Sequence, residues 1–143
     1  MIQNETAAKL PLIMYADDDA DDRLLMNLAI SEWEHAVSLQ IFEDGVLLLR
    51  HLALMRDKEV LPCLIILDIN MPMLSGKDTL RIIRSIDYLK SVPVVLFTTS
   101  SAVEEKFFAK EFGAEFITKP LHLADMDAVL SSFFKFCTHS THI

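Results

Sequence analysis

Apolar segments that are typical of strands alternate with amphipathic segments along this chain. The predicted strands run over residues 10–16, 37–42, 63–67, 94–97 and 115–118. Apolar positions spaced three and four residues apart predict helices over residues 21–34, 46–56, 78–86, 103–112 and 124–137. Five strands that alternate with five helices favour right-handed crossovers and a parallel sheet covered on both faces. We therefore predict a doubly wound, five-stranded α/β fold.

The length of the chain, 143 residues, fits one domain with a core over about residues 12–136 and short flexible tails. No stretch of about 18 apolar residues occurs and the N-terminus lacks a signal-peptide pattern, so we expect a cytoplasmic protein without membrane insertion. The formal net charge of −8 argues against nucleic-acid binding, which requires a basic surface. In that compartment we expect Cys63 and Cys137 to be buried free thiols rather than a disulfide.

Polar side chains follow four of the five predicted strands. They are Asp17 to Asp19 after the first strand, Asp68 after the third, Thr98 to Ser100 at the fourth and Lys119 after the fifth. In a doubly wound sheet, ligands bind outside the carboxyl ends of the strands, where the winding direction switches. We therefore expect these side chains to meet in one shallow site.

If Asp17, Asp18 and Asp68 lie close together, their carboxylates repel one another unless a cation lies among them. Hard oxygen ligands in a small open site favour Mg²⁺, which binds through one or two carboxylates and phosphate oxygens. We expect Lys119 to pair with Asp68 and later with phosphate oxygens, and the Thr98 hydroxyl to donate a further hydrogen bond. Phosphoryl transfer requires positioning and charge neutralisation of this kind.

Each residue also has a purely structural interpretation when it is considered alone. Asp68 would then be the first, solvated residue of a loop, and Lys119 would be an ordinary surface lysine. The acidic run after the first strand also favours the start of a helix, and we expect Asp19, Asp21 and Asp22 to have only that role. The combination of residues, rather than any one of them, therefore carries the functional interpretation.

Four motifs occur in an order and spacing that resemble the receiver domain of bacterial two-component response regulators, from about residue 12 to residue 136. They are Ala16-Asp17-Asp18-Asp19, Asp68-Ile69-Asn70-Met71-Pro72 with Gly76, Leu96-Phe97-Thr98-Thr99-Ser100, and Lys119-Pro120. The resemblance implies a flavodoxin-like fold and a function in two-component signal transduction. The second and third motifs look most like those of stand-alone receivers, including receivers that serve phytochrome-type and hybrid sensor kinases.

The resemblance implies a role for each matching acidic or amide residue. Asp68 corresponds to the phosphoacceptor, which takes a phosphoryl group from a phosphohistidine of a partner kinase. Asp18 corresponds to the carboxylate that binds Mg²⁺ directly, Asp17 to an acidic neighbour that acts largely through water, and Asn70 to the residue whose backbone carbonyl binds the metal. The implied cofactor is therefore Mg²⁺.

Further roles follow from the last two motifs. Thr98 corresponds to the switch hydroxyl, Lys119 to the family's ammonium group, and Phe116 to the switch aromatic. Tyr is common at the position of Phe116, so the hydroxyl contact of some relatives is absent here. The peptide bond before Pro120 is commonly cis in this family.

Other function classes fit the chain less well. A haloacid dehalogenase phosphatase needs an aspartate as general acid two residues after the nucleophile, and that position is Asn70. A nucleotide-binding enzyme needs a glycine-rich phosphate loop, but the three glycines are isolated from one another. An interaction module on the same fold, which signals without being phosphorylated, stays open as the alternative, and the complete set of site residues argues against it.

We therefore expect a stand-alone phosphoacceptor switch rather than a metabolic enzyme. The expected phosphoryl donor is a sensor histidine kinase or a phosphotransfer protein. Because no residues remain after Phe136 for an output domain, we expect the output to pass through a downstream protein or a homodimer.

The last predicted helix carries two groups of apolar side chains. Positions spaced by four, three and four residues form a stripe that is expected to face the sheet, namely Met126, Leu130, Phe133 and Cys137. Phe134 and Phe136 point away from this stripe. We expect them to be exposed aromatics that form an interface with a partner or a second copy, and the alternative is that both pack on neighbouring loops.

Overall fold

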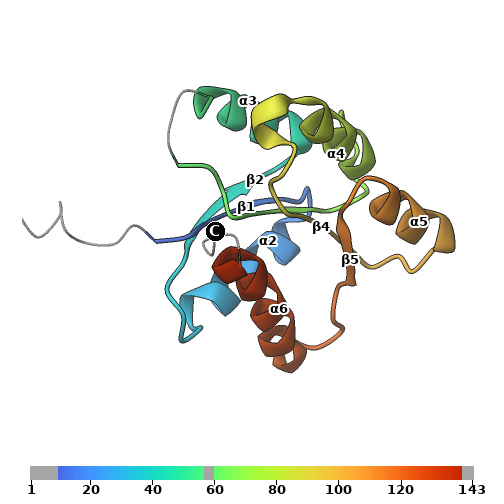
Figure 1. Ribbon diagram of the computed structural model, residues 1–143. Coiled ribbons are helices and arrows are strands. Elements are labelled where there is room, and N and C mark those ends of the chain that lie inside the picture. Colours follow the sequence, from blue (N-terminus) through green and yellow to red (C-terminus); the bar gives the residue numbers. More distant parts are fainter. Residues whose placement is uncertain (1–9, 57–59, 140–143) are drawn as a thin grey trace, which may run out of the picture.

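The computed structural model describes residues 10–56 and 60–139, with side chains as far as residue 137. Within these ranges five parallel strands form one sheet in the order β2-β1-β3-β4-β5 (Figure 1). The strands are β1 (Leu12–Ala16), β2 (Ser38–Phe42), β3 (Leu64–Leu67), β4 (Val94–Thr98) and β5 (Glu115–Thr118). The helices are α2 (Ala20–Ser31), α3 (Gly45–Leu54), α4 (Gly76–Ser85), α5 (Val103–Glu111) and α6 (Met126–His139), with 3-10 turns at Asp87–Leu89 and Leu123–Asp125. The predicted doubly wound α/β fold is confirmed.

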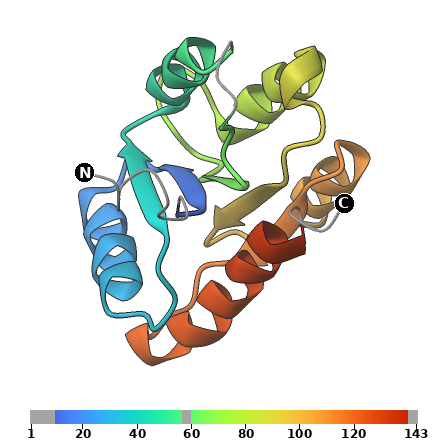
Figure 2. The same ribbon diagram turned by 60° about the vertical axis from the view of Figure 1, so that its left-hand side comes forward.

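Each face of the sheet has its own core, because alternate strand residues point to opposite faces. Helices α3, α4 and α5 cover one face, and α2 and α6 cover the other (Figure 1, Figure 2). Met14 and Ile65 belong to the first core, whereas their strand neighbours Tyr15 and Ile66 belong to the second. All residues of β1 and β3 are buried, as expected of central strands covered on both faces.

Polar side chains explain where three of the helices begin. Asp19 accepts hydrogen bonds from two backbone N–H groups of α2, Asp44 accepts one from Leu47 in α3, and Ser75 accepts one from Asp78 in α4. The predicted role of Asp19 at a helix start is thus confirmed. Helix α4 begins two residues before its predicted start, because its cap lies upstream of the first apolar position.

Arg84, in the last turn of α4, holds several loops together. Its guanidinium donates hydrogen bonds to the backbone carbonyls of Phe112 at 2.7 Å, Lys90 at 3.1 Å, Val92 at 2.8 Å and Gly113 at 3.1 Å. Burial lowers the pKa of Arg84, and the four carbonyl partners offset the loss of hydration. The end of α5 is therefore fixed beside the segment that enters β4.

The expectation of two free thiols is wrong, because Cys63 and Cys137 form a disulfide with Cα atoms 4.8 Å apart. The predicted stripe of α6 is confirmed, since its four residues, the last of them Cys137, are all buried against the sheet. Spacing along the helix predicts the direction in which Cys137 points. It does not predict that Cys63 lies opposite, because that depends on where α6 crosses the sheet.

Two further expectations concern the ends of the chain and membranes. The tails predicted at both ends lie largely outside the described residues, so that prediction stays untested. None of the described helices has the length and the apolar run needed to cross a membrane.

We predict that two glycines resist substitution for different reasons. A Cβ on Gly76 would overlap the backbone carbonyl of Asp68, so Gly76→Ala and Gly76→Asn should both lower the unfolding free energy by about 1–3 kcal/mol. Gly113 has a φ of 66°, and a Cβ there would meet only Arg84 Nε, at 4.0 Å. Gly113→Ala should cost about 1–2 kcal/mol and Gly113→Asn less, because Asn tolerates this backbone conformation. Urea unfolding measures the change in unfolding free energy for each of the four variants. Equal losses of stability for the two Asn variants would contradict this explanation.

Candidate functional site

Parallel pairing brings the ends of four strands to one edge of the sheet. The backbone N–H of Asp68 donates to the carbonyl of Ala16 at 3.0 Å, so β3 ends beside β1. The backbone N–H of Lys119 donates to the carbonyl of Thr98 at 2.8 Å, so β5 ends beside β4. Since β3 and β4 are also paired in parallel, the polar residues that follow these strands share one edge.

Asp17, Asp18 and Asp68 form a carboxylate cluster at this edge. Each contributes one oxygen, and the three oxygens lie within 4.8 Å of one another. Asp17 is fully buried and Asp68 is 7% exposed, whereas Asp18 is open to solvent. Two desolvated carboxylates and one exposed carboxylate suit a divalent cation that keeps several waters, as Mg²⁺ does. The residues present therefore fit a magnesium site, and the part assigned to the exposed Asn70 stays a prediction.

Lys119 donates two hydrogen bonds of 2.7 Å, to Asp17 Oδ2 and Asp22 Oδ2. Its Nζ lies 3.5 Å from Asp68 Oδ1, so the predicted pair with Asp68 is present but is the longest of the three contacts. Burial alone would lower the pKa of Lys119, but the hydrogen bonds and charges of these carboxylates outweigh it and raise the pKa. The expectation that Asp22 serves only the start of a helix is wrong, because its side chain reaches the ammonium.

Tyr15 also belongs to the site, although sequence reasoning did not assign it there. Its hydroxyl donates to Asp17 Oδ2 at 2.6 Å, and the backbone N–H of Asp19 donates to Asp17 Oδ1 at 2.9 Å. With Lys119, these donors hold both oxygens of Asp17. Burial, followed by the charge of Asp17, raises the pKa of Tyr15, so the hydroxyl stays a donor. The sequence contained a signal for this contact, namely the position of Tyr15 two residues before Asp17, because strand residues two apart point to the same face.

Asp68 is a partly desolvated carboxylate beside other charges. Burial and then the negative charge of Asp17 raise the pKa of Asp68 to about 6, while the positive charge of Lys119 acts in the opposite direction. The backbone of Gly76 lies against the carbonyl of Asp68, and its N–H donates to the carbonyl of Ile69 at 2.8 Å. The absence of a side chain at Gly76 therefore lets α4 begin in contact with the Asp68 backbone.

The predicted switch residues lie on β4 and β5. Thr98 is buried, and its Oγ1 accepts a hydrogen bond from the backbone N–H of Ser100 at 3.3 Å. Phe116 is half-buried, with the Lys106 ammonium 5.8 Å from the centre of its ring. The switch roles of Thr98 and Phe116 stay predictions. The peptide bond before Pro120, which is commonly cis in the family that the sequence resembles, is not cis here. The described part of the chain contains no cis peptide bond.

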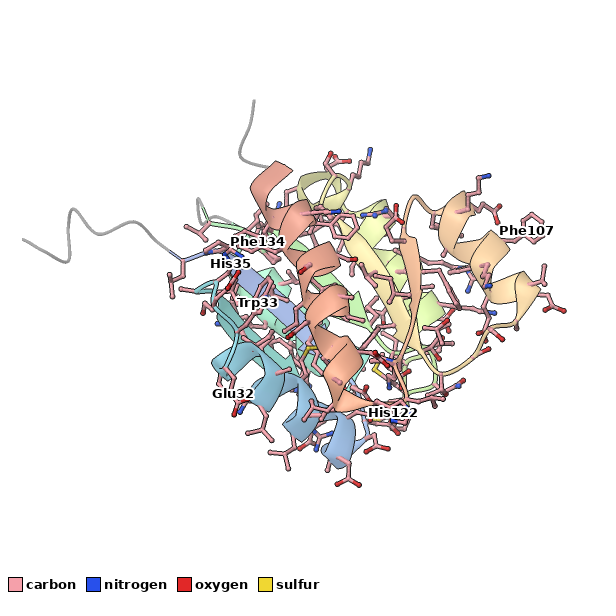
Figure 3. The ribbon with its side chains drawn as sticks, turned by 90° about the horizontal axis from the view of Figure 1, so that it is seen from below. Glu32, Trp33, His35, Phe107, His122 and Phe134 are labelled. Atoms are coloured by element: carbon pink, nitrogen blue, oxygen red, sulfur yellow. A yellow bond between two sulfur atoms is a disulfide. The ribbon has the colours of Figure 1, made fainter. Side chains whose placement is uncertain are left out.

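Phe134 and Phe136 are not the exposed aromatics that we expected. Phe134 stacks on His35 with ring centres 4.4 Å apart and meets Trp33 edge-on at 5.3 Å (Figure 3). Phe136 is half-buried against the core formed by α2, α6 and the sheet. This packing agrees with the alternative of contacts to neighbouring segments. The interface role of the two residues stays a prediction, now without the exposure that motivated it.

Comparison with known families and sequences gives a consistent result. A family model described as "Response regulator receiver domain" matches residues 13–131. Response regulator Rcp1 of Synechocystis sp. is 31% identical over 119 residues, which cover 80% of this chain and 80% of Rcp1. Transcriptional regulatory protein PrrA of Mycobacterium leprae is 30% identical over 125 residues, which cover 87% of this chain and 50% of PrrA. The chain thus matches about half of the length of PrrA.

Solved structures show the same fold. The phosphorylated cyanobacterial phytochrome response regulator RcpA superposes with a TM-score of 0.80 at 24% identity, covering 94% of this chain and 97% of RcpA. The Mn²⁺-bound form of Rcp1 superposes with a TM-score of 0.74 at 26% identity, covering 85% of this chain and 90% of Rcp1. The arrangement of strands and helices is therefore that of receiver domains.

We predict that the affinity for Mg²⁺ falls in acid. Mg²⁺ requires ionised carboxylates, and protons compete for Asp68 below its pKa of about 6. The affinity should be nearly constant above about pH 7 and fall towards about tenfold per pH unit below about pH 5. Isothermal titration calorimetry across this range measures it. Asp68→Asn should bind more weakly and lose the inflection near that pKa, and a wild-type affinity independent of pH would contradict the assignment.

We predict that the Tyr15 hydroxyl supports metal binding through Asp17. Tyr15→Phe removes a 2.6 Å hydrogen bond to Asp17 Oδ2 and should weaken Mg²⁺ binding by about tenfold, since groups that orient a ligand typically affect affinity on that scale. Tyr88→Phe is the matched control, because the Tyr88 hydroxyl donates to the carbonyl of Leu52 instead. Calorimetry compares the two variants, and equal Mg²⁺ affinities would remove Tyr15 from the site.

Proposed function

The chain belongs to the response regulator receiver domain family, and from this premise we propose that it accepts a phosphoryl group on Asp68 from a sensor histidine kinase or a phosphotransfer protein. The observation that carries the proposal is the convergence of the Asp17, Asp18 and Asp68 carboxylates beside Lys119. In this proposal the protein is a switch, and its only chemistry is its own phosphorylation and the hydrolysis of its acyl phosphate.

The proposed reaction is an in-line transfer to a carboxylate. An oxygen of Asp68 attacks the phosphorus of a phosphohistidine, the P–N bond breaks, and the imidazole nitrogen leaves with the electron pair. A pKa of about 6 leaves Asp68 mostly ionised, and so nucleophilic, at neutral pH. Asp17, Asp18 and Asp68, with the backbone carbonyl of Asn70, would hold Mg²⁺, which when bound neutralises charge on the phosphoryl oxygens.

Lys119 and Thr98 would bind the new phosphoryl group. The Lys119 ammonium lies 3.5 Å from Asp68 Oδ1, within reach of a phosphoryl group on that side chain. The Thr98 hydroxyl oxygen accepts a hydrogen bond from the backbone N–H of Ser100, so its O–H group would be able to donate a hydrogen bond to a phosphoryl oxygen. Movement of Thr98 towards that oxygen would leave space for Phe116 to turn inwards, which would reshape the surface of α5, β5 and α6.

The output would pass through a downstream protein or a homodimer in the cytoplasm. The similarity to response regulator Rcp1, which covers 80% of both lengths, supports a signalling role of this kind. The surface that changes around Phe116 would then be the surface that a partner or a second copy recognises.

We predict that acetyl phosphate with Mg²⁺ adds one phosphoryl group to the protein, because the site supplies the nucleophile and the charge neutralisation that the transfer needs. Intact-mass measurement detects the addition. It should be absent from Asp68→Asn and from samples that contain a metal chelator. Asp127→Asn is the matched control, since it changes the same charge at an exposed position of α6 and should be phosphorylated like the wild type.

A wild-type protein that binds Mg²⁺ but gains no phosphoryl group would contradict the proposal. That outcome would favour the interaction module that signals without phosphorylation. Phosphorylation of Asp68→Asn to the wild-type extent would instead assign the phosphoacceptor to another residue.

A further inference from the structure

The Cys63–Cys137 disulfide lies far from the carboxylate cluster along the strands. Cys63 directly precedes β3 and Asp68 directly follows it, so the two residues flank opposite ends of one strand. The bridge joins residues 74 apart in sequence, and the loop that it closes includes Thr98 and Lys119. The disulfide therefore ties the last turns of α6 to the strand that carries Asp68.

A cavity of about 420 Å³ reaches the disulfide from the surface, and both cysteines line it. This volume admits a small organic molecule, since one water occupies about 30 Å³ in the liquid. Most of the lining is apolar, and the carboxylate in it, Asp87, is paired with Lys90 at 3.1 Å. The cavity thus favours an uncharged molecule.

The two cysteine residues differ in exposure. Cys137 is 2% exposed, whereas Cys63 is only half-buried. Thiol–disulfide exchange depends strongly on which sulfur an attacking thiolate can reach. A small thiol that enters the cavity would therefore meet Cys63 first.

We propose that Cys63 is a thiol-modification site, at which a small uncharged thiol forms a mixed disulfide. The thiolate attacks Cys63 Sγ, the bond between the two cysteine sulfurs breaks, and the electron pair goes to the Cys137 sulfur, which takes a proton from water. A second thiol then attacks the mixed disulfide, frees Cys63 as a thiol and leaves as part of a small disulfide. In total the protein disulfide takes up two electrons and two protons, and two small thiols are oxidised to one disulfide.

Exchange at Cys63 removes the covalent constraint on α6 but not its packing. Met126, Leu130 and Phe133 stay buried against the sheet without the bridge, so the helix is expected to stay docked. The unfolded chain, however, regains the conformational freedom that closure of this long loop had removed. The midpoint of thermal unfolding should therefore fall by roughly 10 °C. Met126 also lines a small cavity with Lys119 and Tyr15, so α6 connects the modification site to the carboxylate cluster.

The test uses the full-length, folded protein purified without reductant. It is incubated with 2-mercaptoethanol, quenched with iodoacetamide at successive times, and examined by intact-mass measurement and peptide mapping. We expect an early species with the mercaptoethanol adduct on Cys63 and an alkylated Cys137, followed by a species with both cysteines alkylated. Differential scanning calorimetry of the doubly reduced protein should show the lower midpoint.

Two substitutions of serine by tryptophan test whether the thiol reaches the disulfide through the cavity. Ser91 is exposed and lines the cavity, so Ser91→Trp should slow formation of the adduct several-fold by narrowing the entrance. Ser131→Trp, at an exposed position of α6, is the matched control and should react at the wild-type rate.

Three results would overturn the proposal: two free thiols in protein purified without reductant, exchange that occurs only after unfolding in urea, or an early adduct on Cys137. None of these measurements depends on Asp68. A failure here is therefore distinguishable from a failure of the phosphorylation proposal, which is read from the mass increase with acetyl phosphate.

Discussion

Asp17 is a carboxylate with no exposed surface, and a buried carboxylate is stable only when its charge and its oxygens have partners. Lys119, Tyr15 and the backbone N–H of Asp19 supply those partners within 2.9 Å. Lys119 can do so only because β5 ends beside β4 at the same edge of the sheet. The arrangement of the site therefore depends on this one buried ion pair between the first and last strands in the sequence.

The same ion pair shapes the chemistry of Asp68. Burial and then the negative charge of Asp17 raise the pKa of Asp68, and the ammonium of Lys119 limits the increase. A cation among the carboxylates would favour their ionised forms further. The site thus keeps the Asp68 carboxylate partly out of water, while Asp18 leaves one side of the carboxylate cluster open to solvent.

The two ends of β3 have separate environments. At its carboxyl end Asp68 faces other charged groups, whereas at its amino end Cys63 is bonded to Cys137 beside a mostly apolar cavity. Helix α6 spans the face between them, with Met126 near Lys119 and Cys137 at the disulfide. Helix α6 therefore has residues beside the surroundings of both ends of β3.

The periodicity of apolar residues by itself determined the strands, the helices and the stripe of α6, because these patterns are local consequences of backbone geometry. It also placed Asp17, Asp68, Thr98 and Lys119 at strand ends, since parallel strands share one carboxyl edge. Only the tertiary structure decided that Lys119 bonds most closely to Asp17 and Asp22, and that Cys137 meets Cys63. Those contacts depend on how helices and strands distant in sequence are placed relative to one another, and residue spacing within a single element carries no information about that.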